Sequence, residues 1–191
     1  MKAAFIVFDK MTYLDFVGFY DPLTRLASMN VMADFEWRIL SNRPQVADDR
    51  GAGMKMIPDA VLEPLGAYDI VYVPGGMGTR PLQHDREFVD WLKTAAPARL
   101  KVSVCTGALL LGAAGFLKGR RATTHPGALK DLEPYCDQVL TDRIVDEDSV
   151  ITGGGVSSSI DLGLHVVQKL AGPDARSRIA AQMCYPYRWT A

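Results

Sequence analysis

Cys105 has the sequence surroundings of a nucleophile. It ends the strand-like run Leu100–Val104 and is followed almost at once by the helix-forming run Ala108–Leu111. Gly107 between the two runs permits a tight turn. A cysteine at such a corner lies beside a helix N-terminus, whose partial positive charge favours the thiolate. Nucleophiles of hydrolases built on parallel sheets occupy the same kind of corner. The alternative is that Cys105 is a small buried apolar residue.

Two glycine-rich turns follow other strand-like runs. Asp69–Val73 leads into Gly75 and Gly76, and Thr152 leads into Gly153-Gly154-Gly155. Because the carboxyl ends of parallel strands meet at one edge of a sheet, we expect these turns to converge on the turn at Cys105. The N–H groups of Gly75 and Gly76 would then face a developing anion, unless the glycines serve only to turn the chain. The sequence has no GxGxxG after its first strand and no GxxxxGK[ST], so a dinucleotide or P-loop site is not expected.

The hydrophobic pattern predicts strands that alternate with helices. The expected strands are Ala3–Phe8, Glu36–Ser41, Asp69–Val73, Leu100–Val104, Arg121–His125 and two within Val139–Thr152, with a small hairpin over Val46–Ile57. After a turn from Leu14 to Gly18, the first helix is expected to begin at Pro22 with Asp21 as its cap. The other expected helices are Pro81–Ala96, Cys105–Lys118, Pro126–Glu133, Ser157–Leu170 and Ala175–Cys184, and Ser157, Ser158 or Ser159 is expected to cap the fourth of these. The aromatic tail Tyr185–Trp189 is expected to dock or to form an interface. This order predicts an α/β three-layer sandwich with a mainly parallel central sheet.

The composition is that of an ordinary globular domain, and we expect a single domain over residues 1–191. The net charge of −1 gives no reason to expect nucleic acid or an anionic membrane as a partner. Three widely spaced cysteines argue against a disulfide framework and for a reducing, cytoplasmic compartment. No CxxC pair occurs and the three histidines are scattered, so no metal site is expected. No signal peptide and no run of 18 apolar residues is present.

Several motifs resemble those of a known family. Pro74-Gly75-Gly76, Ser103–Gly107 and Ala122–Pro126 resemble the ThiJ/PfpI superfamily, which is related to the class I glutamine amidotransferases. Within it, the longer stretches Leu14–Asp21, Ser103–Thr124 and Asp142–Asp161 are similar to isocyanide hydratases. The sequence departs from the hydratase pattern after His125, where Pro126-Gly127 replaces a bulkier aromatic residue. The resemblance implies a flavodoxin-like fold and a homodimer.

The resemblance also implies roles for individual residues. Cys105 would be the nucleophile, and Asp15 the acidic residue whose carboxyl group approaches its sulfur. Thr106 would supply a backbone or hydroxyl contact, and Gly153 and Gly154 would line the pocket. Without the resemblance, Asp15 is more simply explained as a helix cap. The reaction implied is cofactor-free hydration of an isocyanide to an N-substituted formamide, in which a cysteine thioimidate forms and Asp15 moves the proton.

Two other functions compete with this interpretation. Other ThiJ/PfpI proteins act on glyoxal-type aldehydes, and related domains in AraC-type regulators sense ligands or oxidation. A regulator would need a DNA-binding module, which the chain does not carry, so an enzyme is favoured. His125 is a possible partner of Cys105, although it follows a separate strand. His84 and His165 are expected to be structural or solvated, and Cys136 and Cys184 are expected to be less reactive than Cys105.

Overall fold

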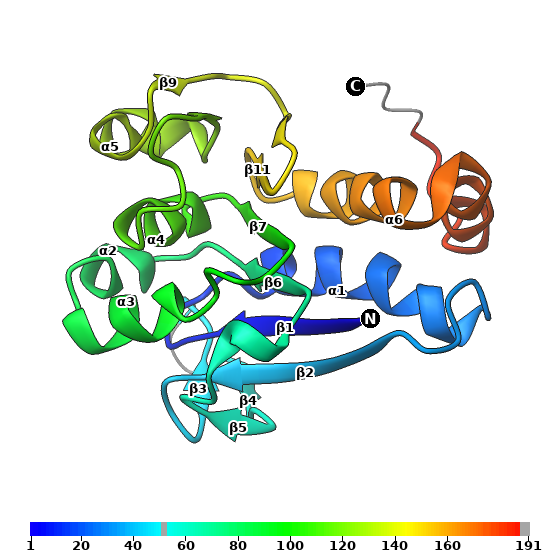
Figure 1. Cartoon of the computed structure of the whole chain (residues 1–191), viewed down its shortest axis with the longest axis horizontal. Helices are drawn as coiled ribbons and strands as arrows, with labels where there is room; N and C mark the ends of the chain where they lie inside the picture. Colours follow the sequence, from blue (N-terminus) through cyan, green and yellow to red (C-terminus); the bar gives the residue numbers. More distant parts are fainter. Residues whose placement is uncertain (51–52, 188–191) are drawn as a thin grey trace.

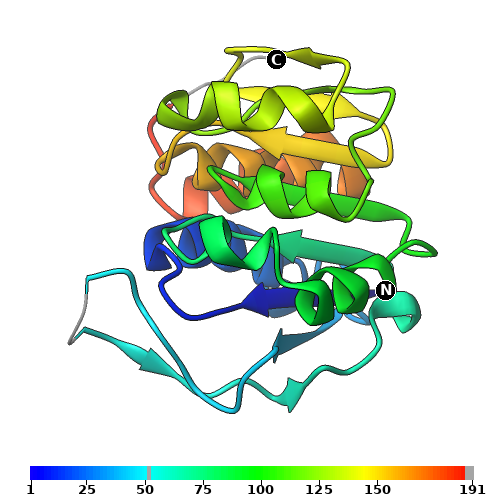
Figure 2. The ribbon, with the colours of Figure 1, turned by 90° about the vertical axis from the view of Figure 1, so that its left-hand side faces the viewer.

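A seven-stranded sheet forms the centre of the computed structural model, which describes residues 1–50 and 53–187. Its strand order is β10-β11-β7-β6-β1-β2-β5, and Figure 2 shows the strands stacked from yellow β10 and β11 down to light-blue β2. The strands are β1 (Lys2–Val7), β2 (Glu36–Ser41), β5 (Ala60–Val61), β6 (Ile70–Val73), β7 (Leu100–Val104), β10 (Ile144–Glu147) and β11 (Val150–Gly153). Every neighbouring pair is parallel except β10 and β11, which form an antiparallel hairpin. The prediction of a mainly parallel sheet is confirmed.

Helices cover both faces of this sheet. The main helices are α1 (Tyr13–Ser28), α2 (Thr79–Leu82), α3 (Arg86–Lys93), α4 (Gly107–Ala113), α5 (Leu129–Leu132) and α6 (Ser158–Gln182). From β1 the chain crosses to β2 on one side of the sheet, whereas from β6 it passes through β7 to β11 on the other side. Because crossovers between parallel strands are right-handed, the helices of these two halves lie on opposite faces of the sheet. Figure 1 shows α1 with α6 on one side and α2 to α5 on the other. The flavodoxin-like three-layer sandwich is therefore confirmed.

The smaller elements lie outside the central sheet. The hairpin predicted over Val46–Ile57 is present as a separate two-stranded sheet of β3 (Val46–Ala47) and β4 (Lys55–Met56). A second small sheet pairs β8 (Arg121–Ala122) with β9 (Gln138–Val139). The strand predicted over Arg121–His125 is therefore wrong beyond its first two residues. The single-turn helices are η1 (Leu65–Ala67), η2 (Pro126–Ala128) and η3 (Glu133–Tyr135).

The prediction that Pro22 interrupts the first helix is wrong. Helix α1 continues through Pro22, so Asp21 lies inside the helix and instead pairs with Arg25 one turn later. A proline removes one helical hydrogen bond and crowds the preceding turn, which is costly in an isolated helix. Here Pro22 is buried against Gly163 of α6. Tertiary packing of the α1 face outweighs the local preference.

Two other helix predictions need correction. The predicted helix Pro81–Ala96 is divided into α2 and α3, because the Asp85 side chain accepts the backbone N–H of Phe88 and caps a new helix. None of the three predicted caps of α6 acts as one. Ser157 is at the N-cap position but makes no side-chain cap hydrogen bond, and Ser158 and Ser159 lie within the helix and donate to backbone carbonyls. The break predicted between the last two helices is present at Gly172, whose φ of 87° interrupts the helical geometry of α6.

The aromatic tail docks in part. The Tyr185 hydroxyl donates to Asp161 at 2.6 Å, and the Tyr187 ring packs edge-on against the Tyr185 ring. Asp161 is buried and also pairs with Arg143, so it joins the tail to the segment before β10. Arg188 and Trp189, the rest of the predicted tail, lie outside the described residues.

Glycines allow α1 and α6 to approach each other closely. A Cβ on Gly163 would collide with the Pro22 ring and would lie 3.1 Å from the Phe19 carbonyl oxygen. A Cβ on Gly18 would collide with the Ser159 hydroxyl. Because the two helices contact each other along much of their length, this packing fixes the position of α1 and of its first turn.

Gly163→Ala is expected to lower the free energy of unfolding by about 1–3 kcal/mol, because the added methyl group overpacks the contact with α1. The higher helix propensity of alanine offsets this loss by at most about 1 kcal/mol. Urea denaturation measures the difference. Gly155→Ala is the control, because its Cβ would meet nothing nearer than the Pro126 Cδ at 3.9 Å. Equal stability of Gly163→Ala and the wild type would contradict the close-packing argument.

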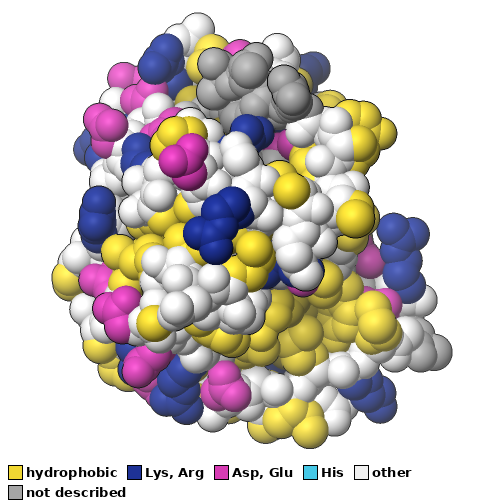
Figure 3. Space-filling model, turned by 90° about the vertical axis from the view of Figure 1, so that its right-hand side faces the viewer, with side chains coloured by type: hydrophobic (Ala, Val, Ile, Leu, Met, Phe, Trp, Pro, Cys, Tyr) yellow, Lys and Arg dark blue, Asp and Glu magenta, His cyan; other side chains and the backbone are white. Residues whose placement is uncertain are grey.

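The surface carries some exposed apolar side chains. Figure 3 shows hydrophobic side chains gathered on the lower part of one face. The large hydrophobic residues that are exposed within the described chain include Leu14 and Val17 on α1, and Met54 and Ile57 beside β4. None of the helices in the described residues has the length and apolarity needed to cross a membrane.

Candidate active site

The predicted site residues lie where four strands end. Asp15 is in the first turn of α1, beyond the end of β1, and Gly75 follows β6. Cys105 follows β7, and Gly153 is the last residue of β11. Strand β1 lies between β2 and β6, so the chain connects to β2 on one side of β1 and continues from β6 on the other side. This reversal of strand order is a topological switch point. Open α/β sheets form their ligand sites at such switch points, beyond the carboxyl ends of the strands.

Hydrogen bonds to the Cys105 backbone hold the turn in place. The Cys105 N–H donates to the carbonyl oxygens of Gly153 and Gly154 at 3.0 and 2.8 Å. The Cys105 carbonyl accepts the Thr124 hydroxyl at 2.7 Å. Cys105 itself has φ of 54°, a left-handed conformation that residues with a Cβ rarely adopt. The strained strand-to-helix corner expected from the sequence is therefore present.

Gly75 brings the acid and the nucleophile together. Its N–H donates to Asp15 Oδ2 at 3.0 Å, and its carbonyl accepts the N–H of Thr12 at 2.9 Å. A Cβ on Gly75 would lie 2.7 Å from Asp15 Oδ2, from Cys105 Cβ and from the Thr106 nitrogen. Only glycine fits here, because any side chain would push these three groups apart.

Asp15 is buried and holds its proton strongly. Its side chain is fully buried, and within the described residues Oδ1 has no conventional hydrogen-bond partner. Burial raises the pKa of Asp15 to about 7 against the opposing hydrogen bonds from Gly75 and Cys105, and the charge of Asp49 raises it slightly further. A carboxyl group with this pKa can gain or lose a proton near neutral pH. The Asp15 side chain does not cap α1, whose N-cap is Thr12.

Cys105 does not have the low pKa expected from its place before a helix. Burial, together with the negative charge of Asp15, raises the pKa of the Cys105 thiol to about 12. Hydrogen bonds from Thr106 act in the opposite direction with smaller effect. Desolvation outweighs the partial charge of the helix N-terminus, so the expectation of a free thiolate is wrong.

Asp15 and Cys105 titrate as a pair. Asp15 raises the proton affinity of the Cys105 thiol, whereas the hydrogen bond from Cys105 lowers that of the Asp15 carboxyl group, so the two groups lose their protons in two coupled steps. Near neutral pH the pair loses one proton and holds one negative charge. A proton can then pass between sulfur and carboxylate without any change in the net charge of the site. Of the three free cysteines, Cys105 is buried, Cys136 is half-buried and Cys184 is exposed.

Thr106 belongs to a buried network of hydroxyl groups. Its Oγ1 accepts the Gly76 N–H at 3.0 Å and lies 3.0 Å from the hydroxyl oxygen of Thr79. The Thr79 hydroxyl also lies 2.8 Å from the Gly76 carbonyl oxygen. Sequence reasoning missed Thr79 and Thr124, because nothing in their local sequence distinguishes them from threonines of ordinary turns.

The predicted anion donors are already engaged. The N–H of Gly75 donates to Asp15, and that of Gly76 donates to Thr106. Gly153 and Gly154 offer carbonyl oxygens to the Cys105 N–H. In this geometry the four glycines hold the acid, the threonine and the nucleophile in place.

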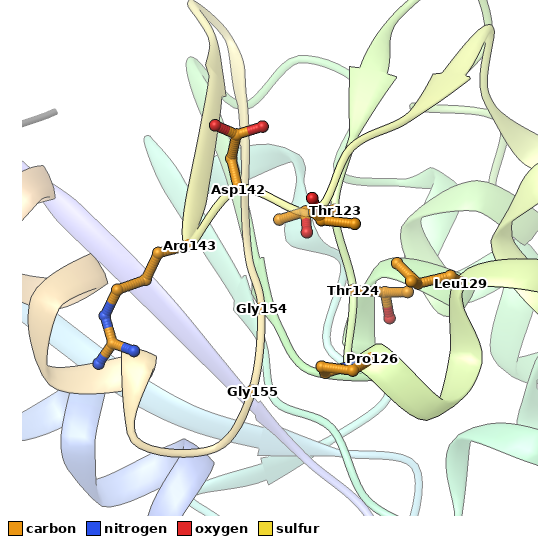
Figure 4. Close-up of a pocket in the computed structure, with 9 residues that line it drawn as sticks. Thr123, Thr124, Pro126, Leu129, Asp142, Arg143, Gly154 and Gly155 are labelled. Atoms are coloured by element: carbon orange, nitrogen blue, oxygen red, sulfur yellow. The ribbon is translucent and has the colours of Figure 1, made fainter.

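A pocket of about 260 Å³ lies against the backbone side of the Cys105 turn (Figure 4). Thr124 and Gly154, which bind the Cys105 backbone, form part of its wall. The Arg143 side chain points away from it, toward the pairing with Asp161. The described residues that line it are Thr123, Thr124, Pro126, Leu129, Thr141, Asp142, Arg143, Gly154 and Gly155. Gly154 therefore lines a pocket as expected, but this pocket has neither Cys105 nor Asp15 in its wall.

His125 is not brought to the thiol by any interaction within the described residues. Its Nδ1 accepts the N–H of Gly127, so the side chain caps the short helix η2. His165 pairs with Asp146 at 2.7 Å, which agrees with a structural role. Among the residues that the structure describes, no group of three His, Cys, Asp or Glu side chains is arranged to hold a metal ion.

Comparisons with known proteins found a matching family and similar sequences. Residues 1–169 match the DJ-1/PfpI family. The chain is 36% identical to an isonitrile hydratase of Pseudomonas putida, over 97% of this chain and 78% of that protein. It is 30% identical to the transcriptional regulator CdhR of Pseudomonas aeruginosa, over 93% of this chain but only 53% of the regulator.

Solved structures give the same picture of the fold. A ThiJ/PfpI family protein from Pseudomonas syringae superimposes with a TM-score of 0.85 and 28% identity, over 100% of this chain and 77% of that one. Drosophila melanogaster DJ-1beta superimposes with a TM-score of 0.81 over 97% of this chain and 98% of that one. At 20% identity, the second likeness establishes the fold alone.

Proposed function

The chain belongs to the DJ-1/PfpI family, and from this premise we propose that it is a cofactor-free enzyme that hydrates isocyanides, also called isonitriles, to N-substituted formamides. One observation carries the proposal: a fully buried carboxyl group, Asp15, whose pKa is raised to about 7, is hydrogen-bonded to the thiol of Cys105 at a strand-to-helix corner. The likeness over 97% of the chain to a protein named isonitrile hydratase supports it.

The pair supplies both groups that the first step requires. The sulfur of Cys105 bonds to the terminal carbon of R–N≡C, and the thiol proton passes to the Asp15 carboxylate. Asp15 then delivers that proton to the same carbon, which gives the thioimidate R–N=CH–S–Cys105. Because Asp15 and Cys105 are desolvated, the carbon is protonated by Asp15 rather than by bulk water.

The second step releases the product. Asp15, ionised again, takes a proton from water as the water oxygen bonds to the thioimidate carbon, and then passes that proton to the nitrogen. The tetrahedral intermediate R–NH–CH(OH)–S–Cys105 then breaks its C–S bond. The hydroxyl proton returns to sulfur through Asp15, so R–NH–CHO leaves and the thiol is restored. The sum is one isocyanide and one water for one formamide.

Isotope labelling tests this proposal directly. The protein is incubated with one aryl and one alkyl isocyanide, and the products are analysed by mass spectrometry. We expect N-formamides that carry ¹⁸O from labelled water and, in D₂O, deuterium on the formyl carbon. Glyoxal is assayed in parallel. Conversion of glyoxal alone, or formamide yields equal to those without protein, would contradict isocyanide hydration.

The pH dependence of kcat/KM follows from the state of the pair. Attack requires the form that has lost one proton, and the pKa of Asp15 is raised to about 7. We therefore expect kcat/KM to rise about tenfold per pH unit below 7 and to level off above it. Melting temperatures over the same range separate this effect from unfolding. An acid limb centred near pH 4, as for an ordinary aspartate, would show that Asp15 is not the group that titrates.

A further inference from the structure

The hairpin of β3 and β4 lies outside the central sheet but contacts the site through the segment that follows β1. The N–H of Asp49, in the turn after β3, donates to the Met11 carbonyl oxygen at 3.1 Å. Met11 also forms an isolated β-bridge with Asp48 of the hairpin and another with Gly76. The segment that contains Met11 therefore joins the hairpin to the glycine turn after β6.

Thr12 gives its side chain to this hairpin rather than to its own helix. It is the N-cap residue of α1 and has an extended backbone, but its side chain makes no capping hydrogen bond. A threonine at this position usually accepts an N–H of the first helical turn. The Thr12 hydroxyl instead donates to Asp49 Oδ2 at 2.7 Å. Because an ionised carboxylate only accepts hydrogen bonds, Asp49 fixes the direction of this hydroxyl.

The backbone of Thr12 holds the catalytic acid in place. Its N–H donates to the Gly75 carbonyl oxygen at 2.9 Å, and its carbonyl oxygen accepts the Asp15 N–H at 3.0 Å. The Gly75 N–H donates in turn to Asp15 Oδ2 at 3.0 Å. These bonds close a ring of three residues. Since Asp15 Oδ2 and Cys105 Cβ both lie against the Cα of Gly75, the position of Thr12 sets how the carboxyl group meets the thiol.

The charge of Asp49 is well placed for this contact. Its side chain is 14% exposed, and its carboxylate lies at the N-terminus of α1, where the helix favours an anion. Arg50 pairs with it at 3.2 Å from solvent, with 81% of the arginine side chain exposed. Burial is the main cause of the raised pKa of Asp15, and the negative charge of Asp49 adds to it. The other titratable groups that face Asp15 are Cys105 and Tyr72.

We propose that Asp49 is a positioning residue: its hydrogen bond with Thr12 keeps the carboxyl group of Asp15 within reach of the reactive sulfur. Without this bond, the Thr12 hydroxyl is free to turn to the helix or to water, and the first turn of α1 can shift relative to Gly75. A displacement of about 1 Å can cost a catalytic group up to about 100-fold in rate. The inference rests on the proposed roles of Asp15 and Cys105, on which Asp49 acts only through Thr12 and through its charge.

Alkylation of Cys105 tests the proposal without any isocyanide. In a Cys136→Ser/Cys184→Ser background, the rate of reaction with iodoacetamide is measured from pH 5 to 9. The wild-type rate is expected to rise to a plateau above pH 7, where Asp15 is ionised and can take the thiol proton. Thr12→Val removes the hydroxyl, keeps the shape and is expected to lower the plateau by about 3- to 10-fold. Thr12→Ser keeps the hydroxyl and is expected to retain the plateau.

Two variants of Asp49 separate the hydrogen bond from the charge. Asp49→Ala removes both and is expected to lower the plateau as Thr12→Val does. Asp49→Asn still accepts the Thr12 hydroxyl and is expected to retain the plateau, but the pH midpoint of its profile should fall, because a negative charge near Asp15 is lost. Asp48→Ala is the matched control, since that carboxylate lies in the same turn but accepts the Arg50 N–H, and it is expected to retain the plateau.

Double-mutant cycles show whether Asp49 acts through Thr12 and on Asp15. Asp49→Ala is expected to lower the plateau no further in a Thr12→Val background, and Thr12→Val is expected to have no further effect in an Asp15→Asn background. Additive effects in either cycle, a wild-type plateau in Thr12→Val, a lowered plateau in Thr12→Ser or Asp49→Asn, or an unmoved midpoint in Asp49→Asn would each overturn the proposal. Thr12→Ala replaces Thr12→Val if the latter melts below the assay temperature. A protein that shows the expected alkylation profiles but makes no formamide would contradict the proposed function and leave this inference standing.

Discussion

Replacement of Cys105 by serine is expected to lower kcat/KM for isocyanide hydration by roughly 10³-fold or more. The serine hydroxyl is far less acidic than a thiol, so Asp15 cannot take its proton as the bond to carbon forms. The side chain is smaller but leaves the same Cβ at the left-handed φ of 54°, so the corner is retained. Rates of formamide formation measured by mass spectrometry check this expectation.

The two other cysteines provide matched controls. Cys136 is half-buried and Cys184 is exposed, and neither has a carboxyl group in a shared buried site. Cys136→Ser and Cys184→Ser are expected to keep wild-type turnover. If Cys105→Ser retained more than a tenth of the wild-type rate, sulfur would not be the nucleophile.

Replacement of Asp15 by asparagine is expected to lower turnover by roughly 10²- to 10⁴-fold, the usual cost of losing a general acid–base group. Asparagine retains the shape and still accepts the Gly75 N–H through its amide oxygen. It can neither receive the thiol proton nor deliver it to carbon. The hydration rate and the melting temperature are measured on the same sample, and a stable variant with near-wild-type turnover would remove Asp15 from the mechanism.

The same variant is expected to gain stability relative to the wild type as pH rises. A folded-state pKa raised to about 7 means that the carboxylate is disfavoured by burial, so the wild type loses stability between pH 4 and 7. Asparagine has no such titration. The difference in melting temperature, Asp15→Asn minus wild type, should therefore increase from pH 4 to 7 and change little immediately above. A difference independent of pH would mean that Asp15 is not desolvated.

The sheet and its nucleophile corner were predictable from sequence. β-Branched residues such as Val102 and Val104 mark a buried strand, and an apolar helical run follows Cys105 without a linker. These signals are local, so they do not depend on how distant parts of the chain pack. The homodimer, the cytoplasmic location and the single domain over residues 1–191 stay predictions.

Contacts between distant parts of the chain could not be predicted from local sequence. The approach of Asp15 to Cys105 was inferred only from resemblance, because no local pattern joins residues 90 positions apart. The acidity of Cys105 was misjudged because a sequence shows that a helix follows but not how deeply the thiol is buried. Pro22 was misplaced for the same reason: its partner, Gly163, lies on another helix. Thr79 gave no signal at all, since its contact with the Thr106 hydroxyl depends on how two turns 27 residues apart pack together.

The strand order has a consequence for how the protein becomes active after synthesis. The hydrogen bond between Gly75 and Asp15 closes a loop of 60 residues, and the Cys105 turn is completed by the carbonyls of Gly153 and Gly154 at the end of β11. Parallel pairings of this kind have high contact order and form late in folding. A chain that has formed its separate helices and hairpins therefore has no site. Assembly of the site therefore requires these distant strands to dock.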